Sequence, residues 1–346
     1  MKDKINKDYL LNILEELLTT PSPSGYCYQI MEKIEKEAEK LGYDFEMTKK
    51  GCGVVTVPGK NDDYTIGLSA HVDTLGAMVR SIKGSGRIRF TSIGGYMMST
   101  VEGEYCQIHT RDNKSYDGTV LTTQPSVHVF ENAKSQDRKE ANMEIRIDEN
   151  VDSKEDVEKL GIGVGDFISF DPRTNIKDNG YIKSRHLDDK AGVAILFALL
   201  EMFKNNDLVP ENTLKIFVST YEEVGHGSSY IPEDIDELIA VDMGAMGDDL
   251  TCTEKDVSIC AKDSSGPYDY FMVGRMKELA EKHELNYAVD IYPRYGSDAS
   301  AALRAGNNIK CALVGPGVHA SHGQERTHLD GLLNSATLLA AYTLNK

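Results

Sequence analysis

The marks of membrane-spanning and exported proteins are scarce in this chain of 346 residues. No apolar run approaches the roughly 20 residues that a membrane-spanning helix needs. The charged residues 1–6 lead into an amphipathic segment instead of the apolar core of a secretion signal. The six cysteines form no C-x-x-C pair and no cluster typical of a disulfide-rich protein. We therefore expect a cytoplasmic protein with reduced thiols.

Basic residues are also in short supply. Lysine and arginine total 38 against 55 aspartate and glutamate residues, which gives a net charge of -17. Such a charge repels nucleic acid and anionic membrane surfaces, so we expect neither as a partner. Hydrophobic residues make up 40% of the chain, enough for packed cores. The length suits one large α/β domain with a smaller companion.

Hydrophobic periodicity divides the chain into two kinds of region. Helix and strand patterns alternate in two separate parts: helices at 7–18, 28–41, 191–203, 268–283 and 331–344, and strands at 53–57, 64–69, 214–221, 237–243, 257–262, 286–292 and 309–315. Between these parts, short β-type runs punctuated by Gly and Asp surround one brief helix at 153–160. This order predicts an α/β fold with a mixed, mainly parallel sheet flanked by helices, formed by residues 1–74 and 172–346. A small β-barrel-like domain is expected as an insertion at 75–171.

Five short segments place possible metal ligands at predicted strand ends or loops. They are His71-Val72-Asp73, Asp188-Asp189, Glu222-Glu223, Asp242 and Ser321-His322. Each has an ordinary explanation alone, such as a helix cap for the aspartate pair or a solvent loop for the glutamate pair. Strand ends converge on one edge of such a sheet, and together these side chains need a common cation. Mixed histidine and carboxylate ligands favour zinc, cobalt or manganese over calcium.

Three familiar catalytic patterns are incomplete. His283-Glu284 lacks the second histidine of a helical H-E-x-x-H zinc site. The glycines at 161, 163 and 165 lack the spacing and helix context of a dinucleotide-binding loop. No G-x-S-x-G motif occurs, which argues against a serine hydrolase of the α/β type.

Motifs along nearly the whole chain resemble the M42 metallo-aminopeptidase family, which includes glutamyl and tetrahedral aminopeptidases. The motifs are SPSGY, AHVDTLGAMV, GRIRF followed by IGG, HLDDKAG, TYEEVGHGS, AVDMG, YGSDASA and a histidine near the end. The resemblance implies two divalent metal ions, zinc or cobalt with manganese as an alternative. The implied ligands are His71, Asp188 and Asp242 for one ion, and Asp188, Glu223 and His322 for the other, so that Asp188 bridges.

The same resemblance implies the remaining roles in the site. Glu222 would be the general base that takes a proton from the attacking water and gives it to the leaving amine. Asp73 would orient His71, because an aspartate two residues after a histidine can brace the imidazole. Ser297 and Asp298, within YGSDASA, are expected to bind substrate.

The last metal ligand departs from the pattern of the family, in which it commonly stands before Ser or Thr and Pro. Here the segment HASHGQERTH offers His319, His322 and His328. The distance to the closing helix favours His322, with His319 second. We expect His328 to serve in packing or hydrogen bonding.

The expected activity is removal of N-terminal residues from short peptides. In the family the inserted domain mediates dimerisation, and dimers build a twelve-subunit tetrahedral shell, so we expect a homo-oligomer. Two other enzyme classes remain open, a metal-dependent deacylase or other amidohydrolase, and a glycosidase, because paired carboxylates also cleave sugars. A non-enzymatic, metal-stabilised peptide binder is a third alternative.

Overall fold

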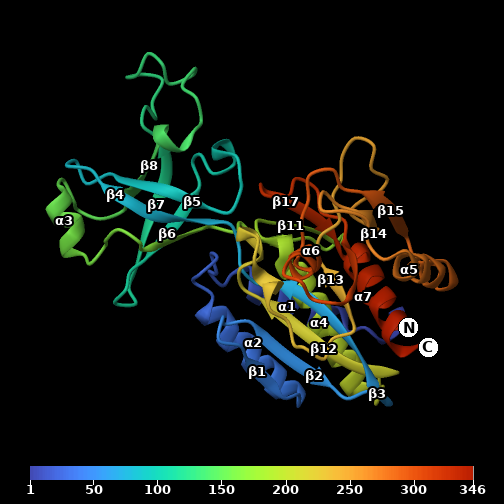
Figure 1. Ribbon diagram of the computed structural model, residues 1–346. Helices are drawn as coiled ribbons and strands as arrows, with labels where there is room; N and C mark the ends of the chain where they lie inside the picture. Colours follow the sequence, from blue (N-terminus) through green and yellow to red (C-terminus); the bar gives the residue numbers. More distant parts are fainter. Residues whose placement is uncertain (346) are drawn as a thin grey trace.

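The computed structural model describes residues 1–345, and its main body is built on one eight-stranded mixed sheet (Figure 1). The strand order is β1-β2-β12-β3-β13-β16-β14-β15. The bounds are β1 Phe45–Met47, β2 Gly53–Val57, β3 Asn61–His71, β12 Asn212–Ser219, β13 Glu237–Val241, β14 Val257–Lys262, β15 Tyr287–Ile291 and β16 Lys310–Pro316. The central strands β12, β3, β13 and β16 run parallel, as do β14 and β15, and the other neighbours are antiparallel.

Helices cover both faces of this sheet because its strands are apolar on both sides. In β13, Ile239 and Val241 pack in one core, whereas Leu238 and Ala240 pack in another, as the alternation of a strand requires. The first core contains side chains from α1 Lys7–Leu18, α2 Tyr28–Leu41, α4 Leu187–Asn205, α5 Tyr270–Lys282 and α7 Leu329–Leu344. The second core contains side chains from the short helix α6 Asp298–Arg304.

Helix α4 lies at the centre of the molecule and starts four residues before the predicted position 191. Its residues are buried without a break from Leu187 to Phe203, so no face of this segment is polar and exposed. Asp188 and Asp189 have non-helical backbone angles, and the peptide bond between them is cis. The first turn of α4 is therefore irregular where the predicted ligands lie.

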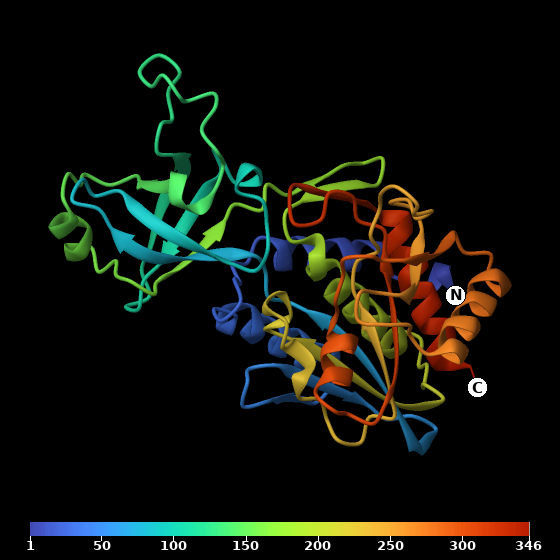
Figure 2. The ribbon, with the colours of Figure 1, turned by 45° about the horizontal axis from the view of Figure 1, so that its top comes forward.

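A closed six-stranded barrel is inserted between β3 and α4. Its strand order is β4-β5-β8-β7-β6-β9, with bounds β4 Gly76–Ile82, β5 Ile88–Ile93, β6 Tyr105–His109, β7 Ser115–Thr122, β8 Met143–Ile147 and β9 Phe167–Phe170. The barrel has its own apolar core and projects to one side of the main body (Figure 2). The short helix α3 Lys154–Lys159 is capped by Ser153, whose hydroxyl accepts a hydrogen bond from the backbone of Asp156. The predicted combination of a helix-flanked mixed sheet with a barrel-like insertion is confirmed.

A small third sheet, absent from the sequence-based prediction, carries the chain from the barrel back to α4. It pairs β10 Asn175–Ile176, β11 Tyr181–Ser184 and β17 Glu325–His328. Single turns of 3-10 helix occur at Lys2–Lys4, Met98–Thr100, Glu140–Asn142, Glu222–Val224 and Gly227–Ser229. Within residues 1–345, none of the helices is both long and apolar enough to cross a membrane.

The parallel strands bring the predicted ligands to one edge of the sheet. His71 is the last residue of β3 and lies opposite Ser219, the last residue of β12. Glu222 follows β12 and Asp242 follows β13 directly. Sites in α/β folds commonly form at the carboxyl ends of parallel strands, and these predicted ligands lie at that edge.

Candidate metal centre

His71 is held at the centre of the site by the segment that follows it. Its ring is almost fully buried, with 1% of the side chain exposed. The Nδ1 atom lies 2.9 Å from the backbone oxygen of Asp73 and 3.6 Å from its carboxylate. Because a carbonyl oxygen can only accept, Nδ1 carries a proton, and Nε2 is the ring nitrogen that faces the site. Asp73 thus orients His71 chiefly through its backbone.

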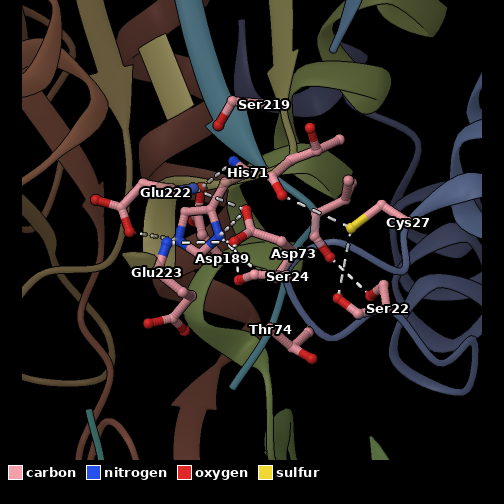
Figure 3. Close-up of polar contacts among 12 residues, drawn as sticks. Ser22, Ser24, Cys27, His71, Asp73, Thr74, Asp189, Ser219, Glu222 and Glu223 are labelled. Atoms are coloured by element: carbon pink, nitrogen blue, oxygen red, sulfur yellow. Dashed lines mark hydrogen bonds and ion pairs between the residues drawn. The ribbon is translucent and has the colours of Figure 1, made fainter. Parts of the chain in front are cut away.

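The Asp73 carboxylate has a different set of partners. It is fully buried and accepts hydrogen bonds from the backbone N–H groups of Glu222 and Glu223, at 3.1 and 3.2 Å. The Ser24 hydroxyl, from the turn before α2, donates a third. Figure 3 shows Asp73 between Ser24 and the two glutamates, with His71 beside them. One carboxylate therefore fixes the start of the glutamate segment against β3.

Asp188 lies between two histidines. Its Oδ1 atom is 3.2 Å from His71 Nε2, and its Oδ2 atom is 3.4 Å from His322 Nε2. Burial opposes ionisation, but the two histidines outweigh it and lower the pKa of Asp188. A carboxylate whose two oxygens face two separate imidazoles has the geometry of a bridging ligand.

Asp189 also enters the cluster, although the family resemblance assigned only its neighbour Asp188 as a ligand. His71, Asp189 and Asp242 each offer one ligand atom within 4.8 Å of the others. Both Asp189 oxygens, however, already accept backbone hydrogen bonds, Oδ2 from His71 at 3.2 Å and Oδ1 from Gly192 at 3.1 Å. Asp189 thereby joins the end of β3 to the first turn of α4.

Glu222 and Glu223 lie near different histidines of the cluster. Glu222 Oε2 lies 3.6 Å from His71 Nε2, and Glu223 Oε2 lies 3.5 Å from His322 Nε2. Burial is the main cause that raises the pKa of each glutamate well above its usual value, and neighbouring carboxylates add to the shift. Asp188, Glu223 and His322 form a second group with ligand atoms within 4.8 Å of one another.

Asp242 completes the side of the site around His71. The residue is 5% exposed, and its Oδ1 atom accepts a hydrogen bond of 2.6 Å from the backbone of Met243. Burial, followed by the charge of Asp188, raises the pKa of Asp242 to about 7. A buried carboxylate beside another carboxylate is costly unless a proton or a cation compensates it.

The three candidate histidines near the C-terminus have separate roles. His322 faces Asp188 and Glu223, whereas His319 is exposed and makes an isolated backbone bridge with Arg326. His328 accepts a hydrogen bond from the backbone of Asp330 and so caps α7. Burial lowers the pKa of His322, but the hydrogen bond with Asp188 outweighs it, and the result is a pKa of about 10. The geometry favours His322 over His319.

Glu325 is a site residue that sequence reasoning missed. It is 2% exposed, and its two oxygens accept hydrogen bonds from the backbone N–H groups of Asp188, at 3.1 Å, and His322, at 3.0 Å. Burial, followed by the charge of Asp188, raises the pKa of Glu325 to about 8. Its position three residues after His322 is the only indication that the sequence offered.

A cavity of ≈ 460 Å³ opens onto these residues. Its walls are Asp188, Glu222, Glu223, Gly225, Asp242, Met243, Arg294, Tyr295, Gly296, Ser297, Ala301, Arg304, Ser321 and His322. Ser297 caps α6 and lines this cavity. Asp298 lies behind it, where its carboxylate accepts hydrogen bonds from the Ser219 hydroxyl at 2.6 Å and the Ser228 backbone at 2.8 Å. Substrate binding by Ser297 and Asp298 stays a prediction.

The donor set fits divalent metal ions. Several buried carboxylates and two imidazoles, each with its Nδ1 proton donated to a backbone carbonyl, face a common space. Like charges so close together raise one another's pKa, and a divalent cation removes that repulsion. Imidazole and carboxylate ligands with an open side toward a cavity are typical of catalytic and not structural metal sites.

Comparison with known sequences gives matches along the chain. The family described as M42 glutamyl aminopeptidase matches residues 51–338. The protein named "Putative aminopeptidase YhfE" from Bacillus subtilis is 47% identical over 333 residues, which is 96% of each chain.

Solved structures agree on the fold. An aminopeptidase from the archaeon Desulfurococcus kamchatkensis superposes with a TM-score of 0.89 at 22% identity, over 98% of this chain and 96% of that one. The TET1 peptidase of Pyrococcus horikoshii, described as assembling into a tetrahedron or a large octahedral shell, gives 0.86 at 22% identity, over 97% and 100%. Both cover the main body and the barrel together.

Proposed function

Because the chain belongs to the M42 family of aminopeptidases, we propose that it removes N-terminal residues from short peptides with two divalent metal ions bound. The observation that carries this proposal is the position of Asp188 between His71 and His322, at 3.2 and 3.4 Å. One ion would be held by His71, Asp188 and Asp242, and the other by Asp188, Glu223 and His322. Zinc or cobalt suits these ligands best, and manganese is an alternative.

When bound, two such ions lower the pKa of a water molecule and polarise the scissile carbonyl. Glu222 is the general base in this proposal. It lines the cavity beside His71 but belongs to neither compact ligand group, so its carboxylate is free to take a proton from the attacking water. Its raised pKa lets it hold that proton and then deliver it to the leaving amine.

The cavity favours a substrate with a free amino terminus. Its walls carry the carboxylates of Asp188, Glu222, Glu223 and Asp242, which attract an ammonium group. An amino terminus held there would leave the first peptide bond beside Glu222. This arrangement supports an exopeptidase, and Ser297 would contact the same part of the substrate.

We also propose that the protein acts in the cytoplasm as a homo-oligomer. All six cysteines are free and buried, in keeping with a reducing compartment. On the barrel, Val127, Val129 and Phe130 are exposed apolar residues, and burying them between copies would be favourable. A dimer formed through the barrel, and a tetrahedral shell of such dimers, is the expected assembly. Light scattering that shows a monomer at micromolar concentration would contradict it.

The test of the proposed chemistry is Glu222→Gln, which keeps the shape of the side chain but removes the base. We expect turnover of aminoacyl reporter amides to fall by about 10²- to 10⁴-fold. Elemental analysis should still find both metal ions, because Glu222 is not a ligand. Glu233→Gln is the matched control. Glu233 is exposed and lies in the loop before β13, and its replacement should leave activity unchanged. Near-normal turnover by Glu222→Gln would remove Glu222 from its role.

A further inference from the structure

We propose that the barrel holds His322 in its metal-binding position through the Gly95 carbonyl and through a buried ion pair between Glu104 and Arg185. This inference rests on the proposed function, in which His322 binds a metal ion. It gives the barrel a role inside each subunit that is separate from assembly.

The first contact is direct. His322 comes from the loop between β16 and β17, and its Nδ1 atom makes a hydrogen bond with the backbone oxygen of Gly95. Gly95 follows β5 and therefore belongs to the inserted segment. Since the carbonyl can only accept, Nδ1 must carry the proton, and Nε2 is left to face Asp188 and Glu223. The barrel thus sets both the tautomer and the direction of this ring.

Glycine is required for the barrel loop to come so close. Gly94 has a φ of +75°, a conformation that disfavours other residues. A Cβ atom on Gly94 would lie 2.5 Å from a methyl carbon of Leu75 and 3.5 Å from the backbone oxygen of Glu223. The loop therefore passes against the glutamate segment of the site before it reaches His322.

The second contact is the ion pair. Arg185 lies in the main body, three residues before Asp188, and its side chain is 6% exposed. Its Nη2 atom is 2.6 Å from Oε2 of Glu104, which lies just before β6 and is 8% exposed. The same nitrogen donates to the backbone oxygen of Thr100 in the barrel, and Nη1 donates to the oxygen of Gly323 at 3.4 Å.

Arg185 consequently joins three pieces of the molecule. It ties the barrel, through Glu104 and Thr100, to the residue next to His322. A guanidinium group can do this because its donors lie in a fixed plane and reach several acceptors at once. Loss of Glu104 would leave the cation of Arg185 buried without its counter-charge, which favours movement of the chain around it.

Glu104→Gln is the variant that tests this role. Glu104 touches none of the proposed ligands, and its second partner, Arg173 at 3.6 Å, has a side chain that is 63% exposed. We therefore expect an effect on metal binding to pass through Arg185 and the loops. Metal-stripped protein is titrated with zinc in a calorimeter. We expect one of the two binding steps to weaken by about 10- to 100-fold, the range seen for groups that orient ligands, and the other to stay unchanged.

Glu102→Gln provides the matched control two residues away. Glu102 pairs at 2.7 Å with Arg138, which belongs to the barrel itself, and the two side chains are 32% and 28% exposed. We expect its zinc titration to match that of the unmodified protein. Arg185→Lys keeps the charge but loses the planar guanidinium group. It should weaken the same zinc-binding step as Glu104→Gln, and it replaces that variant in the test if Glu104→Gln fails to fold.

The outcomes separate this inference from the proposed function. Two unchanged zinc steps in folded Glu104→Gln, or in Arg185→Lys, would show that the pair only joins the domains, and would overturn the inference alone. A lower melting temperature with unchanged zinc affinity has the same meaning. Absence of zinc binding by the unmodified protein would overturn the proposed function and this inference with it.

Discussion

The half of the site around His71 and the half around His322 are built in different ways. His71 ends the central strand β3, its side chain is 1% exposed, and its Nδ1 partner is the backbone of Asp73, two residues away. His322 lies in a loop with 39% of its side chain exposed, and its Nδ1 partner, Gly95, is 227 residues distant in the chain. Both rings are oriented by a backbone carbonyl oxygen. The carbonyl that orients His71 belongs to the same segment as the histidine, whereas the one that orients His322 belongs to the barrel.

This difference indicates that the two halves depend on different parts of the fold. The half around His71 is fixed when the parallel strands form, because β3, β12 and β13 carry its residues to one edge. The half around His322 needs the barrel loop, the turn before α4 and β17 to come together. Local contacts of this kind open more readily than a sheet core. We expect the second half to be the one whose metal affinity responds to changes elsewhere.

The largest effect should come from Asp188→Asn, which removes the charge shared by the two halves. Both oxygens of Asp188 face imidazoles, so zinc binding should weaken in both halves, and the loss of activity should exceed the roughly 100-fold typical of groups that only orient ligands. Zinc titration and reporter-amide assays measure the two losses.

Asp189→Asn is the comparison for that variant. The Asp189 oxygens accept backbone hydrogen bonds from His71 and Gly192, so its replacement should mainly lower the free energy of unfolding, by about 1 to 3 kcal/mol. Zinc binding should persist. If Asp189→Asn abolished zinc binding while Asp188→Asn retained it, the assignment of the bridging ligand would be reversed.

Local sequence patterns were enough to predict many of the helices and strands. The helices α1 and α2 begin and end at the predicted residues, because Asn6 caps the first and Gly42 ends the second in a left-handed conformation. Strand ends also brought the predicted ligands into one cluster. Sequence reasoning missed the strand β1, the helix α6 and the small third sheet of β10, β11 and β17, all of which are too short to show a clear periodicity of their own.

The contacts made by backbone atoms could not be predicted from side-chain identity. The Gly95 carbonyl that orients His322 is a group that every residue possesses, and only the path of the barrel loop selects it. The backbone N–H groups that donate hydrogen bonds to Glu325 and Asp189 were equally unpredictable, because every residue except proline has one. The sequence pattern alone also could not show which of the adjacent aspartates lies between the histidines. The irregular first turn of α4 places Asp188, and not Asp189, facing both of them.

An intermediate effect on zinc affinity is expected when a residue that supports a ligand is replaced, and it should be larger for the half around His322 than for the half around His71. Glu325 holds the backbones of Asp188 and His322, so Glu325→Gln should weaken one zinc step by about 10- to 100-fold. Ser24→Ala removes only one of the hydrogen bonds to Asp73, whose carboxylate keeps two backbone donors. Its zinc affinity should change less than that of Glu325→Gln. A larger loss in Ser24→Ala would contradict the view that the half around His71 is the more firmly built.

The smallest effect expected is on how stability depends on pH. Without metal ions, the pKa of Asp242 is raised to about 7 and that of Glu325 to about 8, both by burial and then by Asp188. The folded protein therefore holds these protons more tightly than the unfolded chain, and stability falls as pH rises from the ordinary carboxyl range through those values. The raised pKa of His322, about 10, adds stability below its unfolded value near 6.5 that is lost as pH rises through 10.

These three shifts act in the same direction, and the raised pKa values of Glu222 and Glu223 add to them. The lowered pKa values of Lys190, about 7, and His109, about 4, act in the opposite direction. Because the raised groups are in the majority, we expect the metal-stripped protein to melt at a lower temperature at about pH 8.5 than at about pH 5.5, by a few degrees. Zinc should reverse the trend, because it binds the deprotonated groups and stabilises more at the higher pH. Asp242→Asn removes the contribution of Asp242 and should make the curve below about pH 7 less steep, while the contributions of Glu325 and His322 remain. A melting temperature of the stripped protein that rises across this range would show that opposing groups such as Lys190 outweigh these carboxylates. The contrast between the halves would then need another physical origin, because two of the three shifted groups, His322 and Glu325, lie in the half around His322.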